Sequence, residues 1–271
     1  MNQFENFINQ ATVIDTETTH VDIEKAELVE LATGRLLDNT WQVINLMYGT
    51  NNPIPPEASA VHNISNRMVK GLPRFDQNTE ESMEIMFLGN TEWFVAHNSN
   101  FDKAVLEKHF SQAMIYQHFK RFSYQSRWIC TFRLAKHFLS NDLDDISSYS
   151  LSYLRYYLDL DVDPDLPAHR ADADVTTCGK LLEFLIDYGV NTDRIDPGMP
   201  IGPQLTDICW SPIPITVWGF GKHKGQKLSE IPSSYFMWCL TNFDSLDPNS
   251  QSYDIDLATS VERELVSRGE L

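Results

Sequence analysis

The sequence has no apolar stretch long enough to cross a membrane, because no run of about 18 apolar residues occurs in the chain. Its opening residues, Met1 to Asn6, lack the basic and apolar segments of a secretory signal. Cysteine is scarce: the four cysteines form no Cys-x-x-Cys pair, and each stands in an apolar stretch. These absences argue against a membrane protein, a secreted disulfide scaffold and a cysteine-based zinc site. We expect a cytoplasmic protein, in a compartment that keeps thiols reduced.

Positive charge is also in short supply. The chain carries 21 lysines and arginines against 38 aspartates and glutamates, a formal net charge of -17 at pH 7. Proteins that bind phosphate backbones through side chains alone are usually basic. Clustered carboxylates that hold a divalent cation present a positive ion to the phosphate instead. A nucleic-acid enzyme of this composition is therefore expected to depend on metal ions.

Length and hydrophobic patterning indicate an α/β fold. The 271 residues, 42% of them hydrophobic, suffice for one large domain with a small companion. Short β-branched or apolar runs predict four strands, at 11–15, 28–33, 41–47 and 93–97. Helical spacing predicts helices at 101–110, 130–139, 149–158 and 171–188, the last closed by Gly189. Strands first, and then strands mixed with helices, are typical of an α/β layer fold.

A shift in composition marks a domain boundary. Between residues 193 and 214 the chain carries five prolines and two glycines, which is typical of irregular structure. We therefore predict a large domain at 1–192, a Pro/Gly-rich linker at 193–214 and a small α+β module at 215–271. A module of this size buries little apolar surface by itself.

Two segments place carboxylates at the edge of a predicted core. Asp15 and Glu17 lie two residues apart at a strand end, so both project from one face. Asp102 opens a helix and shares its inward face with Val105 and Leu106. Each segment also has a purely structural interpretation, as a solvated strand end or as an acid favoured at a helix N-terminus. A carboxylate directed at a core needs a cation or several donors, which favours a metal site.

The third segment precedes and opens the longest predicted helix. Asp174 falls on the apolar stripe of this helix, whereas Asp172 falls off it. Asp174 is a candidate metal ligand, and the alternative is an i,i+4 ion pair with Arg170. His169 stands just upstream, at a fixed distance from an inward carboxylate. That position makes it a candidate general base, although a lone histidine is more often a surface or capping residue.

Read in order, these segments resemble a known family. Asp-x-Glu at 15–17, His-Asn-x-x-Phe-Asp at 97–102 and His-x-Ala-x-x-Asp at 169–174 are similar to the motifs of the DEDDh 3′-5′ exonucleases, whose fold is ribonuclease H-like. The segments at 28–32 and 220–225 look like parts of the exodeoxyribonuclease X subfamily. The resemblance implies a mixed central sheet flanked by helices and an exodeoxyribonuclease X-like C-terminal domain at 215–271.

By matching position, the resemblance implies a site for two Mg²⁺ or Mn²⁺ ions. Its metal ligands would be Asp15, Glu17, Asp102 and Asp174, with His169 as the general base. The expected contacts to the terminal nucleotide are Thr18, His62 and Asn98. His20 stands where many members carry a glycine, so we expect the local turn to differ.

The expected activity is a metal-dependent hydrolase that acts on DNA from the 3′ end and releases nucleoside 5′-monophosphates, as in DNA repair. The same motifs serve RNA trimming and proofreading, so RNA stays open as a substrate. A nucleic-acid-binding or scaffold module with vestigial nuclease activity is the alternative from another class. Lys222 and Lys224, each next to a glycine, are candidate phosphate contacts, and a solvated turn fits them equally well.

Overall fold

The computed structural model describes residues 2–77, 91–112, 123–140, 146–163, 170–250 and 253–271. The chain divides into two compact units, residues 1–210 and 211–271. His169, the predicted general base, lies outside the described residues.

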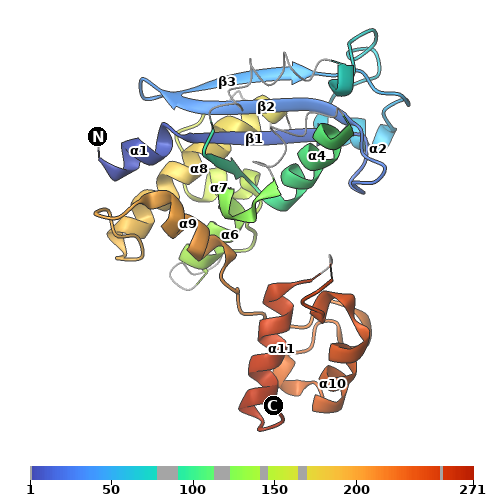
Figure 1. Cartoon of the computed structure of the whole chain (residues 1–271), viewed down its shortest axis with the longest axis vertical. Helices are drawn as coiled ribbons and strands as arrows, with labels where there is room; N and C mark the ends of the chain where they lie inside the picture. Colours follow the sequence, from blue (N-terminus) through green and yellow to red (C-terminus); the bar gives the residue numbers. More distant parts are fainter. Residues whose placement is uncertain (1, 78–90, 113–122, 141–145, 164–169, 251–252) are drawn as a thin grey trace. The chain divides into compact units, whose positions relative to one another are not determined.

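A five-stranded mixed sheet organises the described part of the first unit (Figure 1). Its strands stand in the order β3-β2-β1-β4-β5, with the bounds β1 Ala11–Thr18, β2 Leu28–Leu37, β3 Thr40–Met47, β4 Trp93–Ala96 and β5 Trp128–Cys130. β2 pairs antiparallel with β1 and β3, whereas β4 pairs parallel with β1 and β5. Since helices cover both faces, β1 and most of β2 are buried, which explains their nearly continuous apolar runs.

Neighbouring residues of β1 enter two different apolar clusters, because strand side chains alternate between faces. Val13 joins the cluster formed with α6 (Thr131–Leu139), α7 (Leu151–Tyr157), α8 (Ala171–Asn191) and α9 (Ile201–Trp210). Ile14 joins the cluster formed with α4 (Ser99–Gln112). The described part of this unit also contains two shorter α-helices, α1 at Gln3–Ile8 and α2 at Pro56–His62. The sheet thus lies between two helical layers, as the sequence predicts.

Most predicted elements are confirmed, with small changes at their ends. The segment predicted as a helix at 130–139 begins in the last residue of β5 and continues as α6. Gly189 does not end α8, which continues to Asn191. A Cβ at Gly189 would lie 2.6 Å from Ile195 Cδ1, so this glycine permits close packing rather than a turn.

The prediction of irregular structure throughout 193–214 is wrong, because α9 occupies 201–210. Pro203 lies in the first turn of α9, where a backbone N–H has no helical acceptor to lose. Gly202 lies against Trp93, and a Cβ there would stand 2.4 Å from the indole ring. Leu205 and Cys209 are fully buried in the apolar cluster of α6 and α8. The first unit therefore extends to residue 210.

The second unit is built around α10 (Ser233–Asn242) and α11 (Ile255–Ser267). Trp218, Phe236 and Val261 are fully buried in its own apolar cluster. Among the described residues its extended structure amounts to one antiparallel bridge, Val217 to Lys227, so the β part of the predicted α+β module is small.

Two expectations about composition can be compared with the described residues. None of the helices there is long and apolar enough to span a membrane. The four cysteines are buried and form no disulfide, as expected of small apolar side chains: Cys130, Cys178, Cys209 and Cys239.

Candidate metal centre

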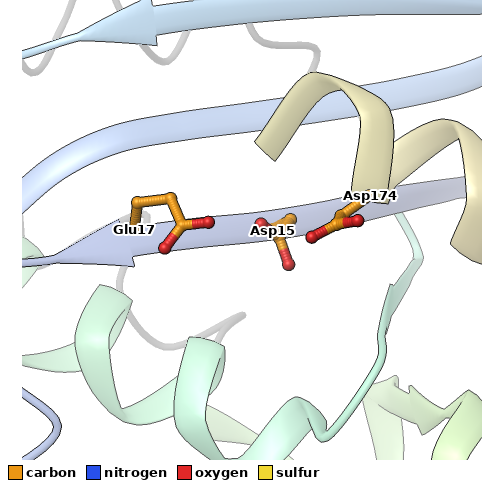
Figure 2. Close-up of side chains that lie close together, drawn as sticks. All are labelled: Asp15, Glu17 and Asp174. Carbon is orange, nitrogen blue, oxygen red and sulfur yellow. The ribbon is translucent and has the colours of Figure 1, made fainter. Parts of the chain in front are cut away.

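Three carboxylates from two elements converge beside β1. Asp15 and Glu17 project from β1, and Asp174 projects from the first turn of α8. One oxygen of each lies within 4.8 Å of the others, and Figure 2 shows Asp15 between Glu17 and Asp174. All three side chains are half-buried. The structure thus brings together three of the four metal ligands expected from the sequence.

The cluster holds more negative charge than its surroundings stabilise. Burial, and then repulsion from Asp102, Glu17 and Asp174, raises the pKa of Asp15 well above its usual value. Burial and repulsion from Asp174 raise the pKa of Glu17 to about 8, while the Arg170 guanidinium partly opposes the shift. Oxygen ligands at this spacing suit a hard divalent cation such as Mg²⁺ or Mn²⁺, which would offset the repulsion. The donor set therefore fits the expected metal.

Asp102 comes from a third element, α4, and its charge acts on Asp15 and Glu17. It stands in the first turn of α4, is 3% exposed, and accepts a hydrogen bond of 2.8 Å from the Thr16 hydroxyl. Burial raises the pKa of Asp102 to about 7, although the bond from Thr16 lowers it in part. Because Thr16 points to the opposite face of β1 from Asp15 and Glu17, one strand supplies two carboxylates and also positions a third.

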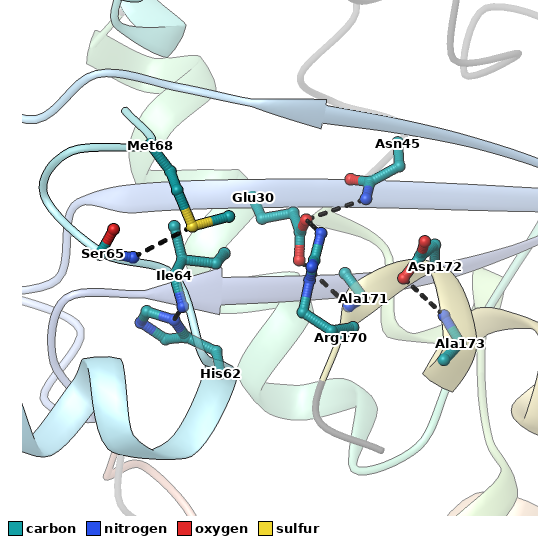
Figure 3. A network of polar contacts seen from close by, with 10 residues as sticks. All are labelled: Glu30, Asn45, His62, Ile64, Ser65, Met68, Arg170, Ala171, Asp172 and Ala173. Atoms are coloured by element: carbon teal, nitrogen blue, oxygen red, sulfur yellow. Dashed lines mark hydrogen bonds and ion pairs between the residues drawn. The ribbon is translucent and has the colours of Figure 1, made fainter. Parts of the chain in front are cut away.

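Glu30 is a buried carboxylate that the sequence analysis did not place in the site. It pairs across the sheet with Glu17 and is fully buried. Its carboxylate accepts hydrogen bonds from Asn45 Nδ2 at 2.9 Å, Arg170 at 2.9 Å and the backbone N–H of Ala171 at 3.1 Å (Figure 3). Arg170, the alternative partner predicted for Asp174, thus forms an ion pair with Glu30.

The Glu30 contacts fix the start of α8, three residues before Asp174. A signal for this role was present in the sequence, because a carboxyl group inside an apolar strand requires buried hydrogen-bond partners. The donors themselves come from β3 and from the residues around the start of α8, far from Glu30 in the sequence. Such a combination of partners is visible only after folding.

The predicted nucleotide contacts near β1 and α4 have local partners. The Thr18 hydroxyl donates to the carbonyl of His20 at 2.9 Å. His20 itself is exposed, and its Nδ1 accepts the N–H of Asp22, so the turn forms without a glycine. Asn98 has a left-handed backbone, with φ 70°, and its carbonyl accepts the N–H of Phe101 at the start of α4. Its side chain is exposed.

His62 and His97 have contrasting environments. His62 is 1% exposed, and its Nδ1 accepts the N–H of Ile64, whereas its Nε2 has no hydrogen-bond partner among the described residues. Burial lowers its pKa. His97 is bonded through both ring nitrogens, to the Thr131 hydroxyl and to the Tyr149 carbonyl, and loss of hydration lowers its pKa to about 4. His97 therefore links β4 to α6 and to the chain before α7.

The remaining predicted contacts belong to the second unit. Lys222 and Lys224 are exposed in the turn that joins the two arms of the Val217–Lys227 bridge. The structure therefore assigns them to a different compact unit from the carboxylates.

Comparison with known proteins decides the family. The model of the RNase_T exonuclease family matches residues 12–182, which include all four predicted metal ligands. The chain belongs to the RNase_T exonuclease family. Exodeoxyribonuclease 10 of Escherichia coli (strain K12) is 28% identical over 243 residues, covering 87% of this chain and 93% of that protein. The enzyme class expected from the sequence, a phosphodiester-hydrolysing exonuclease, is thereby confirmed.

Solved structures agree with the family. A structure of exonuclease X in complex with 5′-overhanging duplex DNA matches with a TM-score of 0.51 and 27% identity, covering 73% of this chain and 99% of that chain. Cell-death related nuclease 4 matches with a TM-score of 0.52 at 15% identity, over 68% of this chain and 65% of that chain, which bears on the fold alone. The ribonuclease H-like α/β fold is confirmed for this exonuclease.

Proposed function

We propose that this exonuclease removes nucleotides from the 3′ end of DNA and releases nucleoside 5′-monophosphates. The observation that carries the proposal is the convergence of Asp15, Glu17 and Asp174, with Asp102 beside them. Two findings favour DNA: the name of the Escherichia coli relative, and the DNA duplex in the exonuclease X complex. A duplex with a 5′ overhang presents a recessed 3′ end, which supports the proposed polarity.

The four carboxylates would hold two Mg²⁺ or Mn²⁺ ions: Asp15, Glu17, Asp102 and Asp174. When bound, such ions supply water activation and neutralise charge that develops on the phosphate and the leaving group. The chain contributes the geometry. β1 fixes Asp15 and Glu17, Thr16 holds Asp102, and Glu30 fixes the first residue of the helix that carries Asp174.

His169 is the proposed general base, which takes the proton of the attacking water. It directly precedes Arg170, whose guanidinium is bonded to Glu30. An imidazole accepts a proton only when it is neutral, so activity should rise with pH as this imidazole loses its proton.

Substrate contacts complete the proposal. Thr18, His62 and Asn98 are proposed to contact the terminal nucleotide. His62 offers the clearest support: its Nδ1 accepts the N–H of Ile64, so the neutral ring carries its proton on Nε2. This buried N–H has no partner among the described residues and can donate a hydrogen bond to a bound base or sugar. Lys222 and Lys224 are proposed to contact the phosphate backbone.

Digestion of end-labelled oligonucleotides tests the proposal. Single-stranded DNA, duplex DNA with a recessed 3′ end, and RNA of the same sequence would each carry a 5′ label. We expect a ladder that shortens from the unlabelled 3′ end, with mononucleotides as the other product, in Mg²⁺ or Mn²⁺ but not in EDTA. Immediate release of the 5′-terminal labelled nucleotide, or undiminished digestion in EDTA, would overturn it, and faster turnover of RNA would reassign the substrate.

A further inference from the structure

The second unit carries an aromatic surface that the proposed reaction does not use. We define the aromatic surface as Phe220, Tyr235, Trp238 and Phe243. Ring centroids are 5.9 Å apart for Tyr235 and Trp238, 5.3 Å for Trp238 and Phe243, and 5.6 Å for Phe220 and Phe243. Trp238 is 51% exposed and Phe220 is 40% exposed. Large apolar rings that share one exposed surface are typical of a binding site.

The aromatic surface rests on a rigid base. Trp218 is fully buried, and its ring lies 4.8 Å from that of Phe220 and 5.7 Å from that of Tyr235. Tyr235 and Trp238 stand three residues apart on α10, so they share one helix face (Figure 1 labels α10). The rings are therefore positioned before any ligand arrives, which lowers the entropic cost of binding.

A lysine loop borders the aromatic surface. The lysine loop, residues 221–227, is tightened by Gly221 and Gly225, whose φ values are 60° and 84°. His223 fixes the loop against the surface, because its ring centroid lies 4.4 Å from that of Tyr235. The three lysines of the loop are exposed: Lys222, Lys224 and Lys227.

The lysine loop is a cationic site in an acidic chain. Residues 211–229 contain these three lysines and no aspartate or glutamate, although the whole chain has a formal net charge of -17. In the described ranges, no carboxylate forms an ion pair with any of the three ammonium groups. Their charge is therefore available to an anionic ligand.

We propose that the aromatic surface and the lysine loop form a binding site for single-stranded nucleic acid. Bases stack on Trp238 and Phe220, and backbone phosphates contact the lysines, a combination that tolerates any sequence because every base has a stacking face. The choice of nucleic acid over another anionic partner rests on the proposed function. The site itself is separate from the carboxylate centre, in a different compact unit.

Binding to the full-length chain in EDTA, where the proposed hydrolysis is off, tests the site. The probe is a fluorescein-labelled oligothymidylate, followed by anisotropy. Trp238→Ala should weaken binding roughly 5- to 140-fold, the range for loss of one stacked base. Lys222→Gln combined with Lys224→Gln should also weaken it, and should reduce the slope of log affinity against log salt by about 1.4.

Matched variants in the same unit serve as controls. Tyr253→Ala removes another exposed aromatic ring, and Arg263→Gln removes another exposed cation. Both should leave the dissociation constant within about twofold. An equal loss in these variants would mean that the aromatic surface and the lysine loop are not the site.

Tryptophan fluorescence reports contact directly. Of the six tryptophans only Trp238 is exposed, since the other five are buried or partly buried, so stacking on unlabelled oligothymidylate should quench the emission of this residue. Trp238→Phe keeps a stacking ring, and it should retain most of the affinity while losing the quenching.

The proposal fails if Trp238→Ala and the double lysine variant both bind like the wild type. It also fails if Trp238→Ala changes only the oligomeric state in light scattering, since the surface would then be a protein interface. Because binding is measured without hydrolysis, a chain that binds but releases no mononucleotides in Mg²⁺ would refute the proposed function and leave this site intact.

Discussion

The carboxylates of the candidate metal centre are positioned in three different ways. Asp15 and Glu17 need only the two-residue period of β1, whereas Asp102 needs the Thr16 hydroxyl and Asp174 needs the fixed start of α8. The raised pKa values of Asp15 and Glu17 mean that protons and cations compete for the same oxygens. Metal binding by this exonuclease should therefore release protons.

The role of Asp174 is open to a controlled substitution. Asp174→Asn keeps the shape of the side chain and removes its charge. We expect the rate of mononucleotide release to fall by more than roughly 100-fold. Removal of a residue that only hydrogen-bonds to a metal ligand already lowers metal affinity or activity by about 10- to 100-fold. Asp172→Asn is the matched control, since Asp172 lies in the same helical turn and bonds locally to the N–H of Ala173. Equal rates for the two variants would contradict the assignment.

Glu17 makes the stability of the metal-free protein depend on pH. Its pKa is raised from 4.5 to about 8 in the fold, because the folded protein favours the protonated carboxyl. The contribution of Glu17 to the free energy of unfolding is therefore most favourable below pH 4.5 and is lost as the pH rises through 8. Without metal, the free energy of unfolding should fall between pH 6.5 and 8.5, by an amount on the order of a few kcal/mol. Denaturant titration at both pH values measures the change.

Two comparisons isolate the cause of that pH dependence. Glu17→Gln should make it less steep, because the variant cannot ionise at this position, while Asp15 and Asp102, whose pKa values are also raised, keep part of the dependence. Saturating Mn²⁺ should stabilise the wild type more at pH 8.5 than at pH 6.5. A metal-free wild type whose stability is constant over this range would refute the electrostatic account.

The single residues show where sequence reasoning succeeds. The spacing of Asp15, Glu17 and Asp174 relative to apolar neighbours predicts which way each side chain points, because strand and helix periods are fixed. That they meet in one site is implied by the resemblance to the exonuclease motifs, and the structure brings these three together. Thr16 and Glu30 escape such reasoning. Their partners, Asp102 and Arg170, lie far away in the sequence, and only the tertiary fold brings them together.

At the scale of elements, α8 is attached to the sheet by glutamates at two places. Glu30 of β2 binds its first residue, and Glu183 on α8 accepts a hydrogen bond of 2.5 Å from Trp41 Nε1 of β3. Both contacts tie the helix to a strand, but only the first lies beside Asp174. Substitutions of Glu30 and Glu183 can therefore be compared, to distinguish a loss of stability from an effect on metal binding.

Glu30→Gln should raise the Mn²⁺ concentration needed for half-maximal activity by roughly 10- to 100-fold, because it loosens the support of a metal ligand. The KM for DNA should change little. Glu183→Gln should lower the unfolding temperature and leave the metal requirement within about twofold. Metal titration and thermal unfolding of both variants measure these effects. Equal metal requirements of the two variants would show that Glu30 does not position Asp174.

The elements also show how composition can mislead. Proline and glycine at 197–203 predict a linker, yet Pro203 fits the first turn of α9 and Gly202 fits under Trp93. Gly189 similarly permits contact with Ile195 instead of ending α8. In each case the residue serves a tertiary contact, and the identity of the neighbouring element is not written in the local sequence.

At the scale of the whole molecule, α9 decides where the first unit ends. Cys209 Sγ accepts the N–H of Cys130 at 3.2 Å, and Trp210 Nε1 donates to the carbonyl of Trp128 at 2.9 Å. Ile201 and Leu205 are buried in the same core. The helix thus completes the cover of β5.

Truncation tests this boundary. A chain of residues 1–210 should fold and still release mononucleotides, but with a higher KM for DNA, because it lacks the proposed contacts of Lys222 and Lys224. A chain of residues 1–192, which ends where the sequence predicts the domain to end, loses the buried side chains of α9. That loss should cost roughly 5 kcal/mol, much of the stability of a typical domain. Circular dichroism melts of the two chains measure the difference, and equal melting temperatures would contradict it.

The junction between the two units is short. Only Ser211 and Pro212 separate α9 from Ile213, whose N–H already donates to Asp256 of the second unit. A tether of this length keeps two binding modules at an effective concentration in the millimolar range. On the proposed function, a strand bound by the lysine loop would then stay attached to the same molecule after each cleavage. Weak binding of DNA by the second unit would then favour several successive hydrolysis steps in one encounter.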